Sequence, residues 1–137
     1  MPYFKYLCSQ LDASRKTLGR MATLENEAAK QSYMHPILAT LLTLFSGRLT
    51  NLHEHTLKGR ITMSGRCEFS IMLQGTIMLL FIEFKDSLSG SQELHSNLIA
   101  QVLAEADGAD LFNQIRECDG VAIHAILTDG NNFEFFL

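Results

Sequence analysis

The chain has 137 residues, of which 47% are hydrophobic and 19% charged, and a formal net charge of −4. This length and composition predict one globular domain spanning residues 1–137 and exclude an intrinsically disordered chain. The apolar runs are too short to cross a bilayer. The negative net charge argues against strong non-specific affinity for nucleic acid, because that affinity depends on neutralising phosphates with basic side chains.

The first ten residues contain Lys5 and lack the apolar core of a secretory signal peptide. Cys8, Cys67 and Cys118 are widely spaced and form no C-x-x-C pair, so reduced thiols are expected. These features predict an intracellular protein, cytoplasmic or nuclear, with no membrane partner. Residues 1–20 have a weakly helical pattern and are expected to form a peripheral segment. The strand-like residues at the C-terminus leave open a longer parent chain.

The predicted elements begin with a helix over residues 24–45, in which apolar side chains recur at steps of three and four. Pro36 lies within it, so this proline either kinks one helix or occupies the first turn of a second helix. Residues 46–59 are largely polar and are interpreted as a connection. Three extended segments are then predicted, over residues 57–63, 67–74 and 77–84.

Residues 87–92 predict a loop in which Ser89 and Gln92 have the spacing of a capping box. A second helix is predicted over residues 92–106, with a short helical tail that reaches Arg116. The remaining pattern predicts strands over residues 121–127 and 133–137, separated by a turn at 128–132. The order α-β-β-β-α-β-β predicts an α/β fold with a mixed central sheet flanked by helices.

The hairpin between the second and third predicted strands places charged residues together. Its loop contains Gly75, and glycine in the first of two loop positions predicts a type II′ turn. In that register the numbers of paired residues add up to 151, so that Glu68 lies opposite Glu83. Lys85 lies two residues after Glu83 and therefore on the same strand face. The same register pairs Arg66 with Lys85, either as a phosphate-binding pair or as a solvated strand end.

Two carboxylates that face each other on neighbouring strands repel, at a cost of up to about 1 kcal/mol. A divalent cation removes this cost, since Mg²⁺ takes oxygen ligands from one or two carboxylates and keeps several waters. The pair Glu68 and Glu83 is therefore interpreted as a metal site with Lys85 beside it. The alternative is a strand that simply ends in charged surface residues.

These residues resemble the motif of the PD-(D/E)xK nuclease superfamily, which has the restriction-endonuclease-like αβββαβ core. In that family an acidic residue lies on the second strand and (D/E)-x-K on the third. Here GRCEF (65–69) offers Glu68, and IEFK (82–85) offers Glu83 and Lys85. The first acid is usually aspartate, so glutamate is a departure that lengthens the reach to a metal. The arrangement is also similar to nuclease-like domains of the crinkler effector type.

The resemblance, which covers roughly residues 24–136, implies hydrolysis of a phosphodiester bond in nucleic acid, with DNA preferred over RNA as partner. It implies Mg²⁺ as cofactor, with Mn²⁺ as a substitute. Glu68, Glu83 and the backbone carbonyl of Phe84 would be the metal ligands. Lys85 would position the attacking water or assist its deprotonation, and would offset negative charge.

Many members of the superfamily also use an acidic residue on the first helix and a glutamine on the helix after the lysine. ENEAAKQ (25–31) offers Glu27 for the first of these roles, with Glu25 as the alternative. NLIAQVLAEADGAD (97–110) offers Gln101 for the second. Both would be accessory residues that orient water or metal ligands.

A catalytically inactive module that uses the same fold for nucleic-acid docking or dimerisation is the competing hypothesis. The net negative charge favours it, whereas the complete set of two carboxylates and a lysine favours the nuclease. The basic segments 14–20 and 57–66 are candidates for contacting nucleic acid. Apolar residues at the end of the chain suggest a homodimer that would cover them, namely Phe133, Phe135 and Phe136.

Histidines provide a weaker signal. HEH (53–55) has no third ligand at zinc-like spacing, so solvated loop histidines are expected there rather than a zinc site. His124 alternates with apolar residues on a predicted strand and is interpreted as structural.

Overall fold

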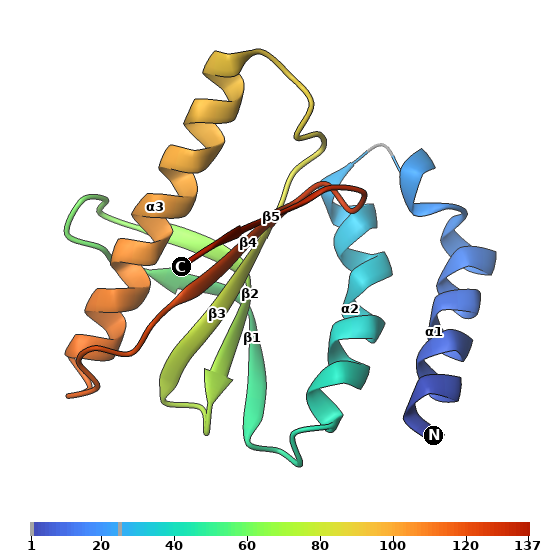
Figure 1. Ribbon diagram of the computed structural model, residues 1–137, viewed down its shortest axis with the longest axis horizontal. Helices are drawn as coiled ribbons and strands as arrows, with labels where there is room; N and C mark the ends of the chain where they lie inside the picture. The colour runs from blue at the N-terminus through green and yellow to red at the C-terminus, as the bar shows by residue number, and fades with distance from the viewer. Residues whose placement is uncertain (1, 25) are drawn as a thin grey trace.

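The computed structural model describes residues 2–24 and 26–137, which form three α-helices, a short 3-10 helix and one five-stranded sheet (Figure 1). The helices are α1 (Pro2–Leu18), α2 (Glu27–Thr43) and α3 (Gln92–Gln114), and the 3-10 helix is Met21–Thr23. The strands are β1 (Leu49–Leu57), β2 (Gly65–Leu73), β3 (Ile77–Phe84), β4 (His124–Thr128) and β5 (Phe133–Phe136).

The strands lie in the sheet in chain order, β1-β2-β3-β4-β5. Neighbouring strands are antiparallel except β3 and β4, which are parallel because α3 connects them as a crossover. The predicted α/β class with a mixed sheet and flanking helices is confirmed. Within the described ranges there is no helix of sufficient length and apolar character to span a membrane.

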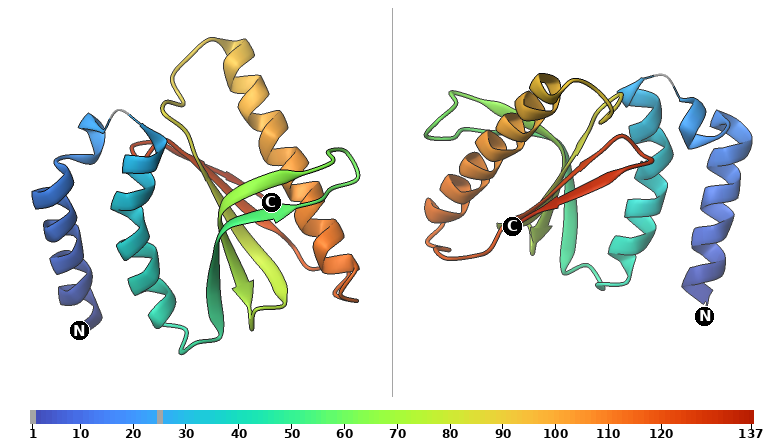
Figure 2. Two further views of the ribbon diagram at one scale, coloured as in Figure 1. Left: turned by 180° about the vertical axis from the view of Figure 1, so that it is seen from behind. Right: turned by 45° about the horizontal axis from the view of Figure 1, so that its top comes forward.

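Each face of the sheet is covered by a different helix. α3 packs on one face over a core that includes Met72, Phe81 and Leu127. α2 packs on the other face, where Phe69 and Phe84 form a smaller core. Figure 2 shows the two helices on opposite sides of the sheet, with α1 outside α2. The end of β3 is therefore within reach of both helices.

The first strand lies earlier than the sequence suggested. Residues 46–59 were interpreted as a connection and residues 57–63 as a strand, but β1 is Leu49–Leu57 and the chain from 58 to 64 is the loop. β1 pairs with β2 alone and is an edge strand, so much of its surface faces solvent. Polar residues are tolerated there, and the sequence lacks the apolar run of a buried strand.

The turn between β2 and β3 also differs from the prediction. Gln74 and Gly75 both have positive φ, of 50° and 71°, and the backbone N–H of Thr76 donates to the carbonyl of Leu73 at 3.0 Å. These central residues define a type I′ turn rather than a type II′ turn with glycine in first place. The predicted turn was therefore one residue out of place.

A β-bulge compensates for this shift before the strands reach their far ends. Next to the turn, the pairs are Leu73–Ile77 and Met72–Met78. Beyond the bulge they are Ile71–Leu80, Ser70–Phe81 and Phe69–Ile82. The predicted pairs near the turn, Gln74–Ile77 and Met72–Leu79, are wrong, whereas Ser70–Phe81 is correct. The observed ladder ends at Phe69–Ile82, and beyond it the backbone N–H of Phe84 donates to the side chain of Glu68, so the direct pairing of Glu68 with Glu83 remains a prediction.

α2 is one helix with Pro36 in its interior, so Pro36 does not begin a second helix. It begins at Glu27 rather than at residue 24 because the side chain of Asn26 caps it, accepting from the N–H of Ala29 at 2.8 Å. Thr40 donates its hydroxyl to the carbonyl of Pro36 at 2.7 Å.

α3 is one continuous helix that ends at Gln114, where the sequence predicted a helix over residues 92–106 followed by a short helical tail. Its N-cap is Ser91, whose hydroxyl accepts from the N–H of Leu94 at 3.2 Å, so the predicted capping box at Ser89 is wrong. Gly108 permits the helix to lie close to β1, since a Cβ at this position would be 3.1 Å from the Cβ of Leu57.

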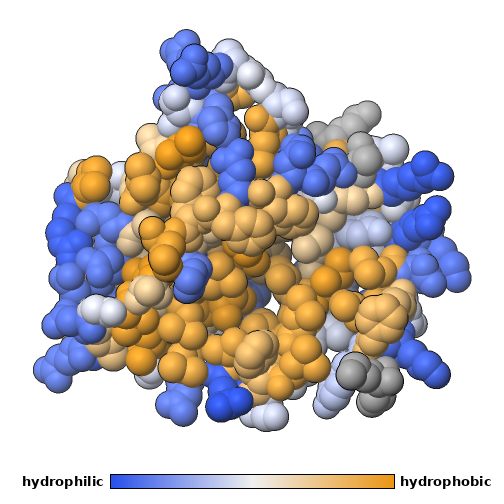
Figure 3. Space-filling model, in the orientation of Figure 1, coloured by the Kyte–Doolittle hydropathy of each residue, from blue (hydrophilic) through white to orange (hydrophobic). Residues whose placement is uncertain are grey.

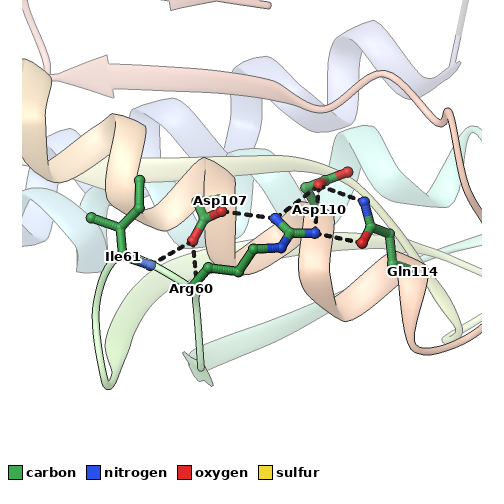
Figure 4. Close-up of polar contacts among 5 residues, drawn as sticks. All are labelled: Arg60, Ile61, Asp107, Asp110 and Gln114. Carbon is green, nitrogen blue, oxygen red and sulfur yellow. Dashed lines mark hydrogen bonds and ion pairs between the residues drawn. The ribbon is translucent and has the colours of Figure 1, made fainter.

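Arg60 anchors the loop after β1 to α3 (Figure 4). Its guanidinium donates to Asp107 at 2.8 Å, to Asp110 at 3.1 Å and to the side-chain carbonyl of Gln114 at 2.5 Å. Asp107 also accepts from the backbone N–H of Ile61 at 3.0 Å. A basic residue of the predicted nucleic-acid-binding segment 57–66 is thus neutralised by two carboxylates of the same chain.

β4 begins three residues later than predicted and β5 ends one residue earlier. Phe136 packs against the core beneath α3, whereas Phe135 is 74% exposed on the edge strand β5. Figure 3 shows apolar surface across much of the face seen in Figure 1, with hydrophilic residues mostly toward its rim. The homodimer remains a prediction.

Candidate active site

The predicted site residues come together where β3 ends, between α2 and α3. Glu83 is the penultimate residue of β3, and Lys85 follows the strand directly. Glu68 reaches the same point from β2, where it contacts the backbone of Phe84. Gln101 reaches it from α3. The arrangement joins side chains from three segments that are separate in sequence.

Glu83 is 3% exposed and is the best-buried acid of this group. Its Oε1 accepts from Lys85 Nζ at 2.8 Å and from Gln101 Nε2 at 2.7 Å. Burial raises its pKa, although the hydrogen bond and charge of Lys85 and the hydrogen bond of Gln101 oppose this rise. Its Oε2 is buried and has no hydrogen-bond partner among the described residues. A buried carboxylate oxygen without a partner is costly unless a ligand compensates it.

Gln101 also donates to Oε1 of Glu105 at 2.8 Å, so one amide group bridges two buried carboxylates. Glu105 is 4% exposed, and its pKa is raised to about 7 by burial and by the negative charge of Glu83. Its Oε2 is likewise buried without a partner in the described part of the chain. Glu105 was not predicted, although its position four residues after Gln101 places both on one helix face.

Glu68 is held from two sides. Its Oε1 accepts from Gln31 of α2 at 2.5 Å, and its Oε2 accepts from the backbone N–H of Phe84 at 2.5 Å. Its pKa is raised to about 8, mainly by burial and then by the negative charge of Glu83, while the Phe84 hydrogen bond opposes the rise. The two carboxyl groups are therefore close enough to repel, as the hairpin register predicted.

Lys85 remains a cation in this arrangement. Burial lowers its pKa, but the hydrogen bond and the charge of Glu83 outweigh burial, and the net pKa is raised. The negative charges of Glu27 and Glu68 act in the same direction. A lysine that holds its proton this firmly supplies positive charge and hydrogen-bond donors, and does not accept a proton from water.

Glu27 is the first residue of α2 and is half-buried. Its negative charge raises the pKa of Glu68, Glu83 and Lys85. Glu25, the alternative for this role, lies outside the described residues.

Lys30 is a second residue that was not predicted. It is 3% exposed, and its Nζ donates to the backbone carbonyl of Asp86 and, at 3.4 Å, to that of Lys85. α2 thereby fixes the chain directly after β3. Its place one helical turn after Glu27 is the sequence signal that could have identified it.

The loop after Lys85 is held by Asp129 in the turn between β4 and β5. This buried carboxylate accepts from the backbone N–H of Leu88 at 3.1 Å and of Asn132 at 2.8 Å. Burial raises the pKa of Asp129, but its hydrogen bonds outweigh this and lower the pKa to about 2. The backbone of Lys85 is itself tied to β4, because its N–H donates to the carbonyl of Thr128 at 2.9 Å.

Among the described residues, 2–24 and 26–137, no group of three His, Cys, Asp or Glu side chains is arranged to hold a metal ion. The carboxylates of the cluster could still bind a divalent cation. Mg²⁺ needs only one or two carboxylates, because waters and substrate oxygens complete its coordination. Glu68, Glu83 and the Phe84 carbonyl are the candidate ligands. The unpartnered Oε2 of Glu83 is the observation that favours them.

The histidines of HEH lie on β1, so the prediction of a solvated loop is wrong. His53 packs against Phe69 with ring centroids 5.1 Å apart, and His55 meets Phe112 edge-on at 5.2 Å. Alternation along the strand is interrupted between them, where Glu54 has a positive φ of 52°. The two rings consequently face the α2 side and the α3 side of the sheet.

No family model, curated protein or solved structure matches the chain significantly. The interpretation of the site therefore depends on its residues and their geometry.

Proposed function

We propose that the chain is a metal-dependent nuclease that hydrolyses phosphodiester bonds in nucleic acid, with DNA as the preferred substrate. The observation that carries this proposal is the buried, unpartnered oxygen of Glu83 within a cluster that also contains Glu68 and Lys85. Burying several carboxyl groups together is unfavourable for folding. A site that takes up a cation gives this arrangement a function.

Glu68, Glu83 and the carbonyl of Phe84 would hold Mg²⁺ or Mn²⁺, which supplies Lewis acidity toward the phosphate and lowers the pKa of bound water. Gln101 fixes the orientation of Glu83 by donating to its Oε1. Lys85 provides the positive charge that offsets the growing negative charge of the phosphate group in the transition state. The restriction-endonuclease-like core implied by the motif is part of the same proposal.

An inactive nucleic-acid docking or dimerisation module is the second candidate, and the excess of acidic over basic residues favours its dimerising form. The net charge is −4, and Arg60 is already paired with Asp107 and Asp110. Arg66 lies 3.8 Å from Glu54. This second candidate retains the folded cluster but predicts no turnover.

The test is incubation of the purified chain with plasmid DNA in Mg²⁺ or Mn²⁺, with and without EDTA. Glu83→Gln removes the charge of the buried carboxylate at nearly constant shape. Glu93→Gln, at an exposed position in the first turn of α3, is the matched control. We expect cleavage by the wild type and the control that disappears with EDTA and with Glu83→Gln.

Cleavage that survives Glu83→Gln would assign the activity to another site or to a contaminant, and would overturn the proposal. Absence of cleavage by a chain that circular dichroism shows to be folded, on RNA as well as DNA, would favour the inactive module.

A further inference from the structure

A cavity of about 310 Å³ lies directly beside Glu68. It is lined by residues of α2 and β1, namely Gln31, Ser32, His35 and His53. Two of them contact Glu68 itself. Gln31 donates to its carboxylate, and the Nδ1 of His53 lies 2.8 Å from its backbone carbonyl oxygen. The cavity therefore adjoins Glu68 of the candidate metal site.

The two imidazole rings in this cavity are fixed in place. A carbonyl oxygen can only accept a hydrogen bond, so Nδ1 of His53 carries the proton and donates, which leaves Nε2 available to a ligand. Phe69 supports both rings from beneath, with centroids 5.1 Å from His53 and 6.2 Å from His35. Phe69 is fully buried, while His35 and His53 are exposed.

The chemistry of the lining argues against a phosphate as the occupant. Among the described residues that line the cavity there is no lysine or arginine. The nearest charged groups include the carboxyl of Glu68, which Gln31 contacts directly. With no cationic side chain in this lining, an anion would lose hydration without an opposite charge to compensate it.

A nucleobase fits the same lining well. It is flat and uncharged, so it can stack on an imidazole ring, and its polar edge can meet the amide of Gln31 and the hydroxyl of Ser32. The cavity lies at the lower end of the range for small-ligand pockets, which suits a single base. A base enters such a site only when it is unpaired.

We propose that this cavity holds an unpaired nucleobase next to the phosphodiester that is cleaved, so that the preferred substrate is single-stranded or carries an unpaired nucleotide at that point. This inference rests on the proposed function, because the adjoining carboxylate site defines the bond that is cut. It adds a substrate class that the catalytic residues alone do not specify.

The experiment compares a labelled single-stranded oligonucleotide, the matching duplex and single strands carrying an abasic position near the cut, using the full chain in Mg²⁺. His35→Ala and His53→Ala are the test variants. His124→Ala is the control, because His124 is exposed at the start of β4 and does not line the cavity. His35→Ala is the more decisive variant, since His53 also bonds to the backbone of Glu68.

We expect the wild type to prefer the single strand, and KM to rise about tenfold in His35→Ala with kcat changed less than about twofold, as loss of one stacking contact predicts. An abasic position in the substrate should raise the KM of the wild type by about the same factor as His35→Ala does. It should not raise the KM of the His35→Ala variant further. Equal cleavage of duplex and single strand, or an unchanged KM in His35→Ala, would overturn the cavity proposal while leaving a Glu83-dependent nuclease intact.

If no substrate is cleaved, the nuclease proposal fails, and fluorescence anisotropy with the same single strand decides the cavity proposal separately. Binding that His35→Ala weakens and His124→Ala does not would support a base-binding cavity in an inactive module. Binding that both variants leave unchanged, or no binding at all, would overturn it.

Discussion

Replacing Glu68 by glutamine is expected to stabilise the metal-free protein at pH 8 but not at pH 5. The pKa of this carboxyl is about 8 in the folded chain, against an ordinary value of 4.5, because the group is buried and faces the charge of Glu83. Between these values the unfolded chain releases the proton more readily, so wild-type stability falls as pH rises. The loss of unfolding free energy caused by Glu68 is absent below pH 4.5 and complete above pH 8.

The magnitude follows from the difference between the two pKa values. A difference of about 3.5, from 4.5 to about 8, corresponds to roughly 5 kcal/mol of unfolding free energy. The substitution also weakens the hydrogen bonds from Gln31 and Phe84, because an amide has one acceptor atom where a carboxylate has two; this costs about 1 kcal/mol. The variant should therefore be more stable by roughly 3 kcal/mol at pH 8 and within about 1 kcal/mol of the wild type at pH 5.

Urea unfolding followed by circular dichroism in EDTA, at both pH values, measures this difference. Glu93→Gln serves as the control and should show no such dependence on pH, because the side chain is exposed. A wild-type stability that does not change between pH 5 and pH 8, or a Glu68→Gln variant that is less stable at pH 8, would refute the reasoning.

Three further predictions concern the metal, the chain after β3 and the contact of α3 with β1. Millimolar Mg²⁺ or Mn²⁺ should raise the Tm of the wild type at pH 8 but not that of Glu83→Gln, measured by scanning fluorimetry; an equal rise in both would place the cation elsewhere. Lys30→Met should lower kcat ten- to a hundredfold, because Lys85 loses its backbone support, and an unchanged kcat would make Lys30 irrelevant to the site. Gly108→Ala should destabilise by about 1 kcal/mol in urea, because crowding against Leu57 outweighs the gain in helix propensity; a stabilised variant would contradict the close approach.

The sheet was predictable where its strands are buried on both faces. β2 and β3 begin and end within two residues of the prediction, because their apolar runs admit no other interpretation. β1 was missed because an edge strand needs no such run. Its partner β2 and the supporting aromatic ring of Phe69 make it a strand, and both are tertiary contacts that a local pattern does not contain.

The register of the hairpin beyond the bulge, as far as Phe69–Ile82, was predicted correctly for an incomplete reason. The turn was placed one residue too late, and the bulge between Ile71 and Met72 shifts the register back by one residue. A turn type can be inferred from glycine, but a bulge within an apolar run leaves no distinct local signal. The prediction at the site end of the hairpin was right because the two errors cancel.

The candidate site was predictable only as far as its motif extends. Glu68, Glu83, Lys85 and Gln101 were expected from the resemblance, and the structure brings them into contact. Lys30 and Glu105 were not expected, although both are almost fully buried. Lys30 bonds to the carbonyl of Lys85, 55 residues away, and no local pattern contains that contact. Glu105 accepts from Gln101 on the same helix, so helical spacing was the one signal available for it.

The charge balance of the cluster links metal binding to protons. Glu68 and Glu105 have pKa values of about 8 and about 7, so both carboxyls hold a substantial share of their protons at neutral pH. A cation bound by Glu68 and Glu83 must displace the proton from Glu68, and binding must therefore tighten as the pH rises toward 8. Isothermal titration of Mn²⁺ at pH 6 and pH 8 in buffers of different ionisation enthalpy would measure both the affinity and the protons released. Affinity that does not change between these pH values would mean that the cation binds without Glu68 and without Glu105, and both would then have to be removed from the metal site.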